Sequence, residues 1–353
     1  MTALKRRLVS PLEVLRRRRG RGDGRLRSLP ILALSVHSAC NCCCVMCDIW
    51  KANAERREIS APDLDRHVDA IRKLRVRRVM LTGGEPLLHS NLWALASRLR
   101  ALRIRITLVT TGLLLRQHAA DVVRSCDEIV VSVDGPREVH DAIRRVPGGF
   151  ERLAAGVAAV RALSPVCAVA GRSVVQRENY RHLADTVRAA RELTLDRISF
   201  LAADVTSGAF NRPEPWDDER RAEIALAPDD LPRFAEVIEQ LIDDRSGDMR
   251  SGFIENSPGS LSRLYRHFAA LAGQGPFPEG RCNAPWVSAV LEPGGLLRPC
   301  FFHRPYGVLN GAPLGSLLNS PQAIAFRQQL DVTRDATCRR CTCALKLGDG
   351  QGV

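Results

Sequence analysis

Residues 31–47 read ILALSVHSACNCCCVMC, an apolar run followed at once by five cysteines. The run at 31–36 has the pattern of a buried strand, so the cysteines are expected on the loop that follows it. Within this loop Cys40, Cys44 and Cys47 have the spacing C-x3-C-x2-C. Three thiolates on one tight loop suit three corners of a cubic [4Fe–4S] cluster and leave the fourth iron open to a small chelating molecule. Zinc is the alternative, but a closed zinc site favours four ligands, usually in two separated pairs.

This strand opens an alternation of strands and helices. Strand-like apolar runs lie near 31–36, 78–82, 104–110, 128–133, 166–175 and 197–202. Helix-like amphipathic stretches alternate with them, near 60–74, 91–102, 116–125, 149–163 and 180–193. Ser60 is a candidate N-cap for the first of these helices. Six βα units predict a parallel sheet, either open and doubly wound or part of a (β/α) barrel, with the chemistry at the carboxyl ends of its strands.

The twelve cysteines fall into two groups and two single residues. Five lie in 40–47, five in 282–343, and Cys126 and Cys167 stand alone beside apolar runs. The arginine-rich start of the chain lacks the apolar core of a secretion signal, and without secretion cysteine clusters favour metals or catalysis over disulfides. The two groups therefore predict two metal sites, and the two single cysteines are interpreted as core thiols.

A glycine pair ends the second predicted strand. Residues 81–86 read LTGGEP, with Gly83 and Gly84 at the carboxyl end of the strand. Glycines in this position let backbone carbonyls approach a ligand closely. Glu85 is expected to be structural within its turn rather than a general base.

The combination of C-x3-C-x2-C with GGEP one βα unit later resembles the radical S-adenosylmethionine (SAM) superfamily, and the match covers roughly residues 30–205. The resemblance implies an α/β fold built on a partial (β/α)6, TIM-like barrel. It implies that Cys40, Cys44 and Cys47 bind a [4Fe–4S] cluster, whose open iron binds the amino and carboxylate groups of SAM. Cys42 and Cys43 are interpreted as bystanders, since other ligand choices break the family spacing.

The same resemblance assigns further cofactor contacts. The 83–86 segment, with Glu85 and Pro86, is expected beside the SAM amino group. The remaining expected contacts are Thr111 after the third strand, Ser132 and Asp134 near the ribose, Arg144 nearby, and the segment 174–179 near the adenine. Met46 stands where the family usually has an aromatic residue beside the adenine, a role that a thioether can fill.

The second cysteine group predicts a second site. Cys282 and Cys300 bracket Gly295 as C-x12-G-x4-C, consistent with a hairpin that turns at 293–295, and Cys338 and Cys341 form a C-x2-C pair. Local spacing alone fits either an iron–sulfur cluster or zinc. The pattern resembles the SPASM extension of radical SAM enzymes in its shortened, twitch-like form. That resemblance assigns these four cysteines to one auxiliary [4Fe–4S] cluster, with Cys343 as a rival fourth ligand or a spare.

Four regions are expected along the chain: a basic extension at 1–29, the barrel at 30–205, a helical connector at 206–281 and a small cysteine-rich iron–sulfur domain at 282–353. The net charge is +13, and residues 1–29 carry ten basic and two acidic side chains. This extension is interpreted as a solvated basic tail, so nucleic acid is an unlikely partner. No apolar run is long enough to span a membrane, and a cytoplasmic enzyme is expected.

The resemblance implies reductive cleavage of SAM to a 5′-deoxyadenosyl radical, which abstracts hydrogen from a substrate C–H bond. No side-chain acid or base is required for that step, so no catalytic side chain is assigned. The auxiliary cluster is expected to assist a net oxidation, and an electron donor such as flavodoxin or ferredoxin is implied. The substrate class stays open between a small metabolite and a peptide. A zinc-binding nucleic-acid protein is the alternative from another class, but it leaves GGEP and the βα units without a role.

Overall fold

The computed structural model describes residues 9–353, and its framework is one sheet of nine strands in the order β6-β5-β4-β3-β2-β1-β7-β8-β9. The first six strands and β7 are mutually parallel, whereas β8 pairs antiparallel with β7 on one side and with β9 on the other. The strands are β1 (Ile31–His37), β2 (Arg78–Gly83), β3 (Arg105–Thr110), β4 (Glu128–Ser132), β5 (Ala168–Val175), β6 (Arg197–Ala202), β7 (Ser288–Leu291), β8 (Leu296–Arg298) and β9 (Gly307–Val308). Each of the six strands predicted from apolar runs is present.

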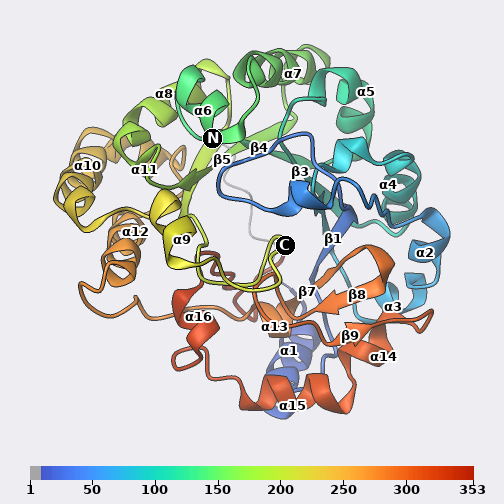
Figure 1. Ribbon diagram of the computed structural model, residues 1–353. Coiled ribbons are helices and arrows are strands. Elements are labelled where there is room, and N and C mark those ends of the chain that lie inside the picture. Colours follow the sequence, from blue (N-terminus) through green and yellow to red (C-terminus); the bar gives the residue numbers. More distant parts are fainter. Residues whose placement is uncertain (1–8) are drawn as a thin grey trace.

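Helices cover the outer side of the curved sheet, and Figure 1 shows them as a ring around the strands. The barrel helices are α2 (Ala61–Asp65), α3 (Val68–Lys73), α4 (Leu92–Ala101), α5 (Leu115–Ser125), α6 (Arg137–Arg144), α7 (Gly149–Leu163) and α8 (Leu183–Glu192). The main core lies between strands and helices, with side chains such as Leu34, Leu81 and Leu95 fully buried. Among the described strands β6 and β9 are the sheet edges, so the barrel is partial, as the expected (β/α)6 fold class requires.

The stretch after Ser60 forms two short helices in place of one. Ser60 caps α2 through a reciprocal capping box with Asp63, as its predicted N-cap role requires. The helix ends at Asp65, and α3 begins at Val68. Between them the buried His67 takes the inward position, while Val68 is only half-buried.

The connector contributes α9 (Asp218–Ile224), α10 (Leu231–Asp244), α11 (Ser246–Ser251) and α12 (Pro258–Leu271). The C-terminal region adds α13 (Ala284–Val287), α14 (Leu314–Leu318), α15 (Pro321–Gln329) and α16 (Ala336–Arg340) to the last three strands. Its hairpin turns at Pro293–Gly295, as predicted. Because β7 pairs in parallel with β1, the C-terminal region extends the barrel sheet. The domain boundary at 282 therefore stays a prediction, and the sheet continues across it.

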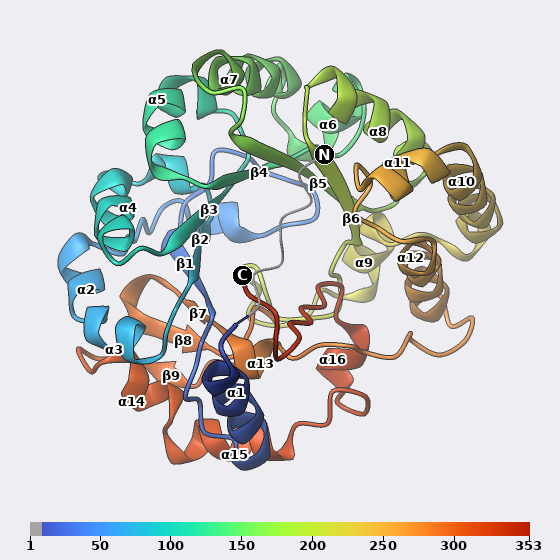
Figure 2. The same cartoon turned by 180° about the vertical axis from the view of Figure 1, so that it is seen from behind.

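The interpretation of 1–29 as a solvated tail is wrong for its described part, and residues 1–8 lie outside the described residues. Pro11–Asp23 form helix α1, which lies against α15 (Figure 2). Arg17, only 4% exposed, bonds to Glu13 and to backbone carbonyls of Gly348, Asp349 and Gln351 near the chain end. A buried arginine with these partners is a structural group, and a guanidinium so engaged is withheld from external anions.

Candidate active site and auxiliary centre

A cavity of about 940 Å³ lies at the carboxyl ends of the parallel strands. Its lining includes Cys40, Cys44 and Cys47, and it leaves out Cys42 and Cys43. The cysteines that line the cavity from this loop are thus the three with C-x3-C-x2-C spacing. This donor set of three thiols facing one cavity suits a cluster with one open iron.

Hydrogen bonds to neighbouring segments fix the cluster loop at 40–47. The side chain of Asn53 accepts from the Cys40 amide and donates to the Cys40 carbonyl, both at 2.9 Å. The Val45 amide donates to the Ile143 carbonyl at 3.0 Å, and the Trp50 indole donates to the Cys47 carbonyl at 2.8 Å. With its start, middle and end held, the loop presents its thiols in a set arrangement before any ligand binds.

Local electrostatics favour a thiolate at Cys44. A hydrogen bond from Cys42 and the charge of Arg144 lower the pKa of Cys44 to about 6, against the effect of burial. Nη1 of Arg144 lies 3.5 Å from Sγ of Cys44. Burial instead raises the pKa of Cys47 to about 12, so this thiol needs a metal to hold it deprotonated.

The glycine pair lies directly against the start of the cluster loop. The Gly84 amide donates to the His37 carbonyl at 2.8 Å, and the Glu85 amide donates to the Ala39 carbonyl at 2.9 Å. A Cβ on Gly84 would stand 2.1 Å from the Ala39 carbonyl oxygen, and Gly83 has φ +140°. Only glycine fits this approach and this conformation. Both glycines line the cavity, and Glu85 and Pro86 do not.

Glu85 is fully buried and holds the turns after β2 and β3 together. Its carboxylate accepts from the Thr110 hydroxyl and the Thr111 amide, each at 2.7 Å, and from the Leu87 amide at 3.0 Å. Burial raises the pKa of this carboxyl, and the hydrogen bonds oppose the rise. These contacts give Glu85 the structural role expected of it.

The other predicted cofactor contacts divide into two sets. Thr111, Ser132 and Arg144 line the cavity. Asp134 does not: it is fully buried, and its carboxylate accepts from Nε of Arg144 at 2.6 Å and from the Val174 amide at 2.8 Å. Asp134 therefore orients Arg144, and its predicted place beside the ribose stays a prediction.

The connector packs over the cluster loop. The indole of Trp216 donates to Oδ2 of Asp48 at 2.8 Å, and Arg220 donates to the Val45 carbonyl. Phe210, which lines the cavity, meets Phe302 edge-on at a centroid distance of 5.9 Å. The connector thus bridges the cluster loop and the C-terminal region along one wall of the cavity.

The second cysteine group is assembled from several separate segments. Cys282 precedes α13, Cys300 follows β8, Cys338 lies in α16, and Cys341 is its C-cap. Burial raises the pKa of Cys300 to about 11, and repulsion from Cys282 and Cys343 adds to the rise. Burial also raises the pKa of Cys338, together with Asp335 and neighbouring thiols, and that of Cys341, together with Cys343 and neighbouring thiols. Thiols are the ligands that an iron–sulfur cluster or another soft metal centre prefers. None of the four lines the cavity, whereas Cys343 and the preceding Thr342 do.

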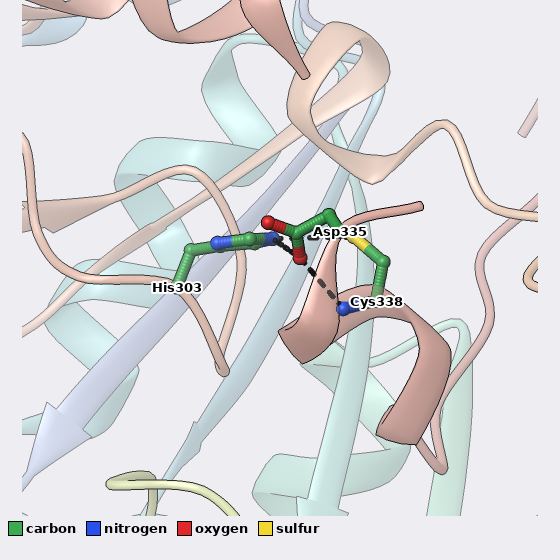
Figure 3. Close-up of side chains that lie close together, drawn as sticks. All are labelled: His303, Asp335 and Cys338. Atoms are coloured by element: carbon green, nitrogen blue, oxygen red, sulfur yellow. Dashed lines mark hydrogen bonds and ion pairs between the residues drawn. The ribbon is translucent and has the colours of Figure 1, made fainter. Parts of the chain in front are cut away.

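One side chain at this centre was not predicted from the sequence. Nε2 of the buried His303 lies 3.2 Å from Sγ of Cys338 (Figure 3). Asp335 lies 3.7 Å from the same imidazole nitrogen and accepts from the Cys338 amide at 2.8 Å. One ligand atom from each of these three residues falls within 4.8 Å of the others. The signal available in the sequence was the nearness of His303 to Cys300.

Comparison with known proteins decides the family. The family model described as the radical SAM superfamily matches residues 34–190, and the model described as an iron–sulfur cluster-binding domain, SPASM, matches residues 282–342. The chain carries a radical SAM domain followed by a SPASM domain. Its cofactors are accordingly SAM and a [4Fe–4S] cluster, with auxiliary cluster binding in the C-terminal region, and the second match ends one residue before Cys343.

Similar curated proteins include the pre-heme d1 synthase of Dinoroseobacter shibae, 28% identical over 201 residues, which cover 56% of this chain and 49% of that protein. The AdoMet-dependent heme synthase of Methanosarcina barkeri is 26% identical over 54% of this chain and 56% of its own length. The mycofactocin maturase MftC of Mycolicibacterium smegmatis is 28% identical over 51% and 45%. The chain therefore spans about half the length of these relatives.

Solved structures share the fold across most of the chain. The crystal structure of Streptococcus suis SuiB bound to S-adenosylmethionine matches 93% of this chain and 75% of that one, with a TM-score of 0.62 at 16% identity. The structure of anSMEcpe with bound AdoMet matches 88% and 86%, with a TM-score of 0.63 at 18% identity. Among the described residues no helix has both the length and the apolar character needed to cross a bilayer.

Proposed function

We propose that this chain is a radical SAM oxidoreductase that abstracts hydrogen from an organic substrate held in the 940 Å³ cavity. Cys40, Cys44 and Cys47 hold the SAM-binding cluster. The observation that carries the proposal is the cavity lining, which combines these three thiols with Gly83 and Gly84 and excludes the other two loop cysteines. When bound and reduced, SAM and its cluster supply a 5′-deoxyadenosyl radical.

The chain's own residues bind, orient and shield. Gly83 and Gly84 leave backbone free to approach the amino group of SAM, while Thr111, Ser132 and Arg144 offer polar contacts along the same wall. Apolar side chains such as Met80, Val109 and Val130 complete the wall and restrict water around the reacting atoms. An electron donor of the flavodoxin or ferredoxin class supplies the reducing equivalent.

Cys282, Cys300, Cys338 and Cys341 hold one auxiliary [4Fe–4S] cluster as an electron acceptor, which makes the overall reaction an oxidation. The match to the iron–sulfur cluster-binding family model, which ends at residue 342, and the absence of these four cysteines from the cavity lining support this assignment. Cys343, which faces the cavity, is left outside the ligand set.

The substrate is a small molecule or the reactive part of a peptide. Relatives named for heme and heme d1 synthesis support the first class, and a SuiB structure bound to the precursor peptide SuiA supports the second. The cavity is at the upper end of the size range of small-ligand pockets, which leaves space beside SAM for either.

The test is anaerobic reconstitution, with iron and zinc analysis followed by SAM and a strong reductant. About eight irons per chain and release of 5′-deoxyadenosine are expected from two [4Fe–4S] clusters. About four irons with 5′-deoxyadenosine would overturn the auxiliary assignment alone. Zinc without 5′-deoxyadenosine would overturn the proposed function as a whole.

A further inference from the structure

Arg172 is an arginine of the cavity wall without a carboxylate partner among the described residues. It lies in β5, where Arg172 and Val174 line the cavity and the intervening Ser173 is fully buried. Nε of Arg172 is buried and has no hydrogen-bond partner within residues 9–353. No carboxylate of those residues lies within 4.0 Å of its guanidinium, in contrast to every other arginine of the lining.

The other four arginines of the lining are neutralised in the structure. The pairs are Arg57 with Glu55 at 2.7 Å, Arg144 with Asp134 at 2.6 Å, Arg298 with Glu292 at 2.7 Å, and Arg212 with Asp204. Glu55, Asp204 and Glu292, the acidic residues of the described lining, are therefore all engaged. The cavity has one positive charge left over, at Arg172.

A half-buried guanidinium without a partner is costly unless a ligand supplies the missing negative charge. Its planar fork matches a carboxylate or a phosphate, which it binds through two parallel hydrogen bonds. We propose that Arg172 is the subsite for an anionic group, a carboxylate or phosphate, of the substrate. This assignment deepens the proposed function, and it rests on that function in taking the anion to be part of the substrate.

SAM also has a carboxylate, so the side of the cavity matters. Arg172 lies in β5, four strands away in the sheet from β1, and β1 is the strand that the cluster loop follows. Arg144, by contrast, reaches Cys44 of the cluster loop. Arg172 thus serves the wall of the cavity formed by β5, and Arg144 serves the side of the cluster loop.

Cys343 provides a reporter for the test, because it is exposed and lines the same cavity. Anaerobic, cluster-loaded protein is treated with iodoacetate or with uncharged iodoacetamide, and alkylation of Cys343 is followed by peptide mass spectrometry. Both reagents attack the same thiolate, so the ratio of their rates cancels any change in the thiol pKa. An anion subsite raises the ratio by about fivefold, the order expected for one partly solvated charge pair.

The variants are chosen to separate the effect of the Arg172 charge from the effect of removing any positive charge at the cavity. Arg172→Gln is expected to remove the preference for iodoacetate, and Arg172→Lys to keep much of it. Arg57→Gln removes an equal charge that is already paired, and is expected to leave the ratio unchanged. Succinate and inorganic phosphate, as competing probes, are expected to slow iodoacetate in the wild type and not in Arg172→Gln, and the stronger of the two identifies the anion.

Three results would overturn the proposal. Equal ratios in wild type and Arg172→Gln would show that no anion site exists there. Loss of the preference on adding SAM alone would assign Arg172 to the SAM carboxylate. If Cys343 resists both reagents, Val174→Cys on the same face of β5 replaces it as reporter, and an unchanged ratio there also refutes the site. None of these readouts needs SAM cleavage, so failure of the proposed function is detected separately by absence of 5′-deoxyadenosine.

Discussion

The two cysteine groups differ in how the chain brings their thiols together. The first group occupies eight consecutive residues on one loop, and hydrogen bonds to Asn53, Ile143 and Trp50 hold that loop in place. The second draws its thiols from segments up to 59 residues apart, between Cys282 and Cys341. A contiguous loop defines its metal site through local spacing, whereas a dispersed set depends on the fold that brings its segments together.

The two groups also differ in whether their cysteines line the cavity and in the side-chain nitrogen that lies beside one of the thiols. Three loop cysteines line the cavity, and the four C-terminal cysteines of the assigned ligand set are absent from its lining. Arg144, a cation, lies 3.5 Å from Cys44, while His303 lies 3.2 Å from Cys338. Burial lowers the pKa of His303, which favours the neutral imidazole. The site that lines the cavity thus has a cation beside one of its thiols, and the C-terminal site has a neutral imidazole beside one of its thiols.

The largest expected effect is the loss of SAM cleavage in Cys40→Ala. Removing one of three ligands leaves a second iron without a protein ligand, and 5′-deoxyadenosine formation is expected to fall to background. Cys43→Ala is the matched control, because its thiol belongs to the same loop and is absent from the cavity lining. Equal loss in both variants, with equal iron, would refute the ligand assignment.

Cys338→Ala is expected to remove one cluster and leave the other. Iron should fall from about eight to about four per chain. Cleavage of SAM without substrate should continue, since the second group does not line the cavity. Cys343→Ala serves as the comparison and should retain full iron. Unchanged iron in Cys338→Ala, or loss in Cys343→Ala, would transfer the fourth ligand position to Cys343.

Arg144→Gln is expected to lower the free energy of unfolding by about 3–5 kcal/mol, because it leaves the fully buried Asp134 without its cation. The double variant with Asp134→Asn removes both charges and should recover part of that loss. Urea denaturation followed by circular dichroism measures both proteins under anaerobic conditions. Equal stabilities for single and double variants would show that the pair is not coupled.

Much of the barrel was predictable, and the reasons lie in local patterns. The six parallel strands follow apolar runs because one face of each strand packs against the helices and the other faces the barrel interior. Ser60 and Asp63 form the capping box that a predicted N-cap implies. Helix α6 was not predicted, because its sequence REVHDAIR has too few apolar residues to show a helical period. Its buried face includes the polar residues His140 and Arg144. A helix whose buried face includes polar residues cannot be predicted from the spacing of its apolar residues alone.

The unpredicted parts depend on contacts between distant segments. The basic stretch at 11–23 gave no sign that Arg17 would bond to carbonyls 331 to 334 residues away. That Arg172 has no acidic partner among the described residues can be recognised only once the charged side chains that line the cavity are known. The same holds for the donor at the auxiliary centre, where His303 and Cys338 are 35 residues apart.

The smallest expected effect tests that donor. A hydrogen bond from His303 to a thiolate ligand stabilises the more negative, reduced form of a cluster, so His303→Phe should lower the reduction potential of the auxiliary cluster. A tenfold change in the reduced-to-oxidised ratio corresponds to about 59 mV for one electron, and a shift of this order is expected. His303→Gln, which can still donate, should shift less. An anaerobic redox titration followed by electron paramagnetic resonance measures both clusters in one sample, so the Cys40–Cys44–Cys47 cluster acts as the internal reference. A shift of that reference by the same amount would mean that His303 acts through the fold as a whole, and iron lost from His303→Phe would instead make the imidazole a ligand.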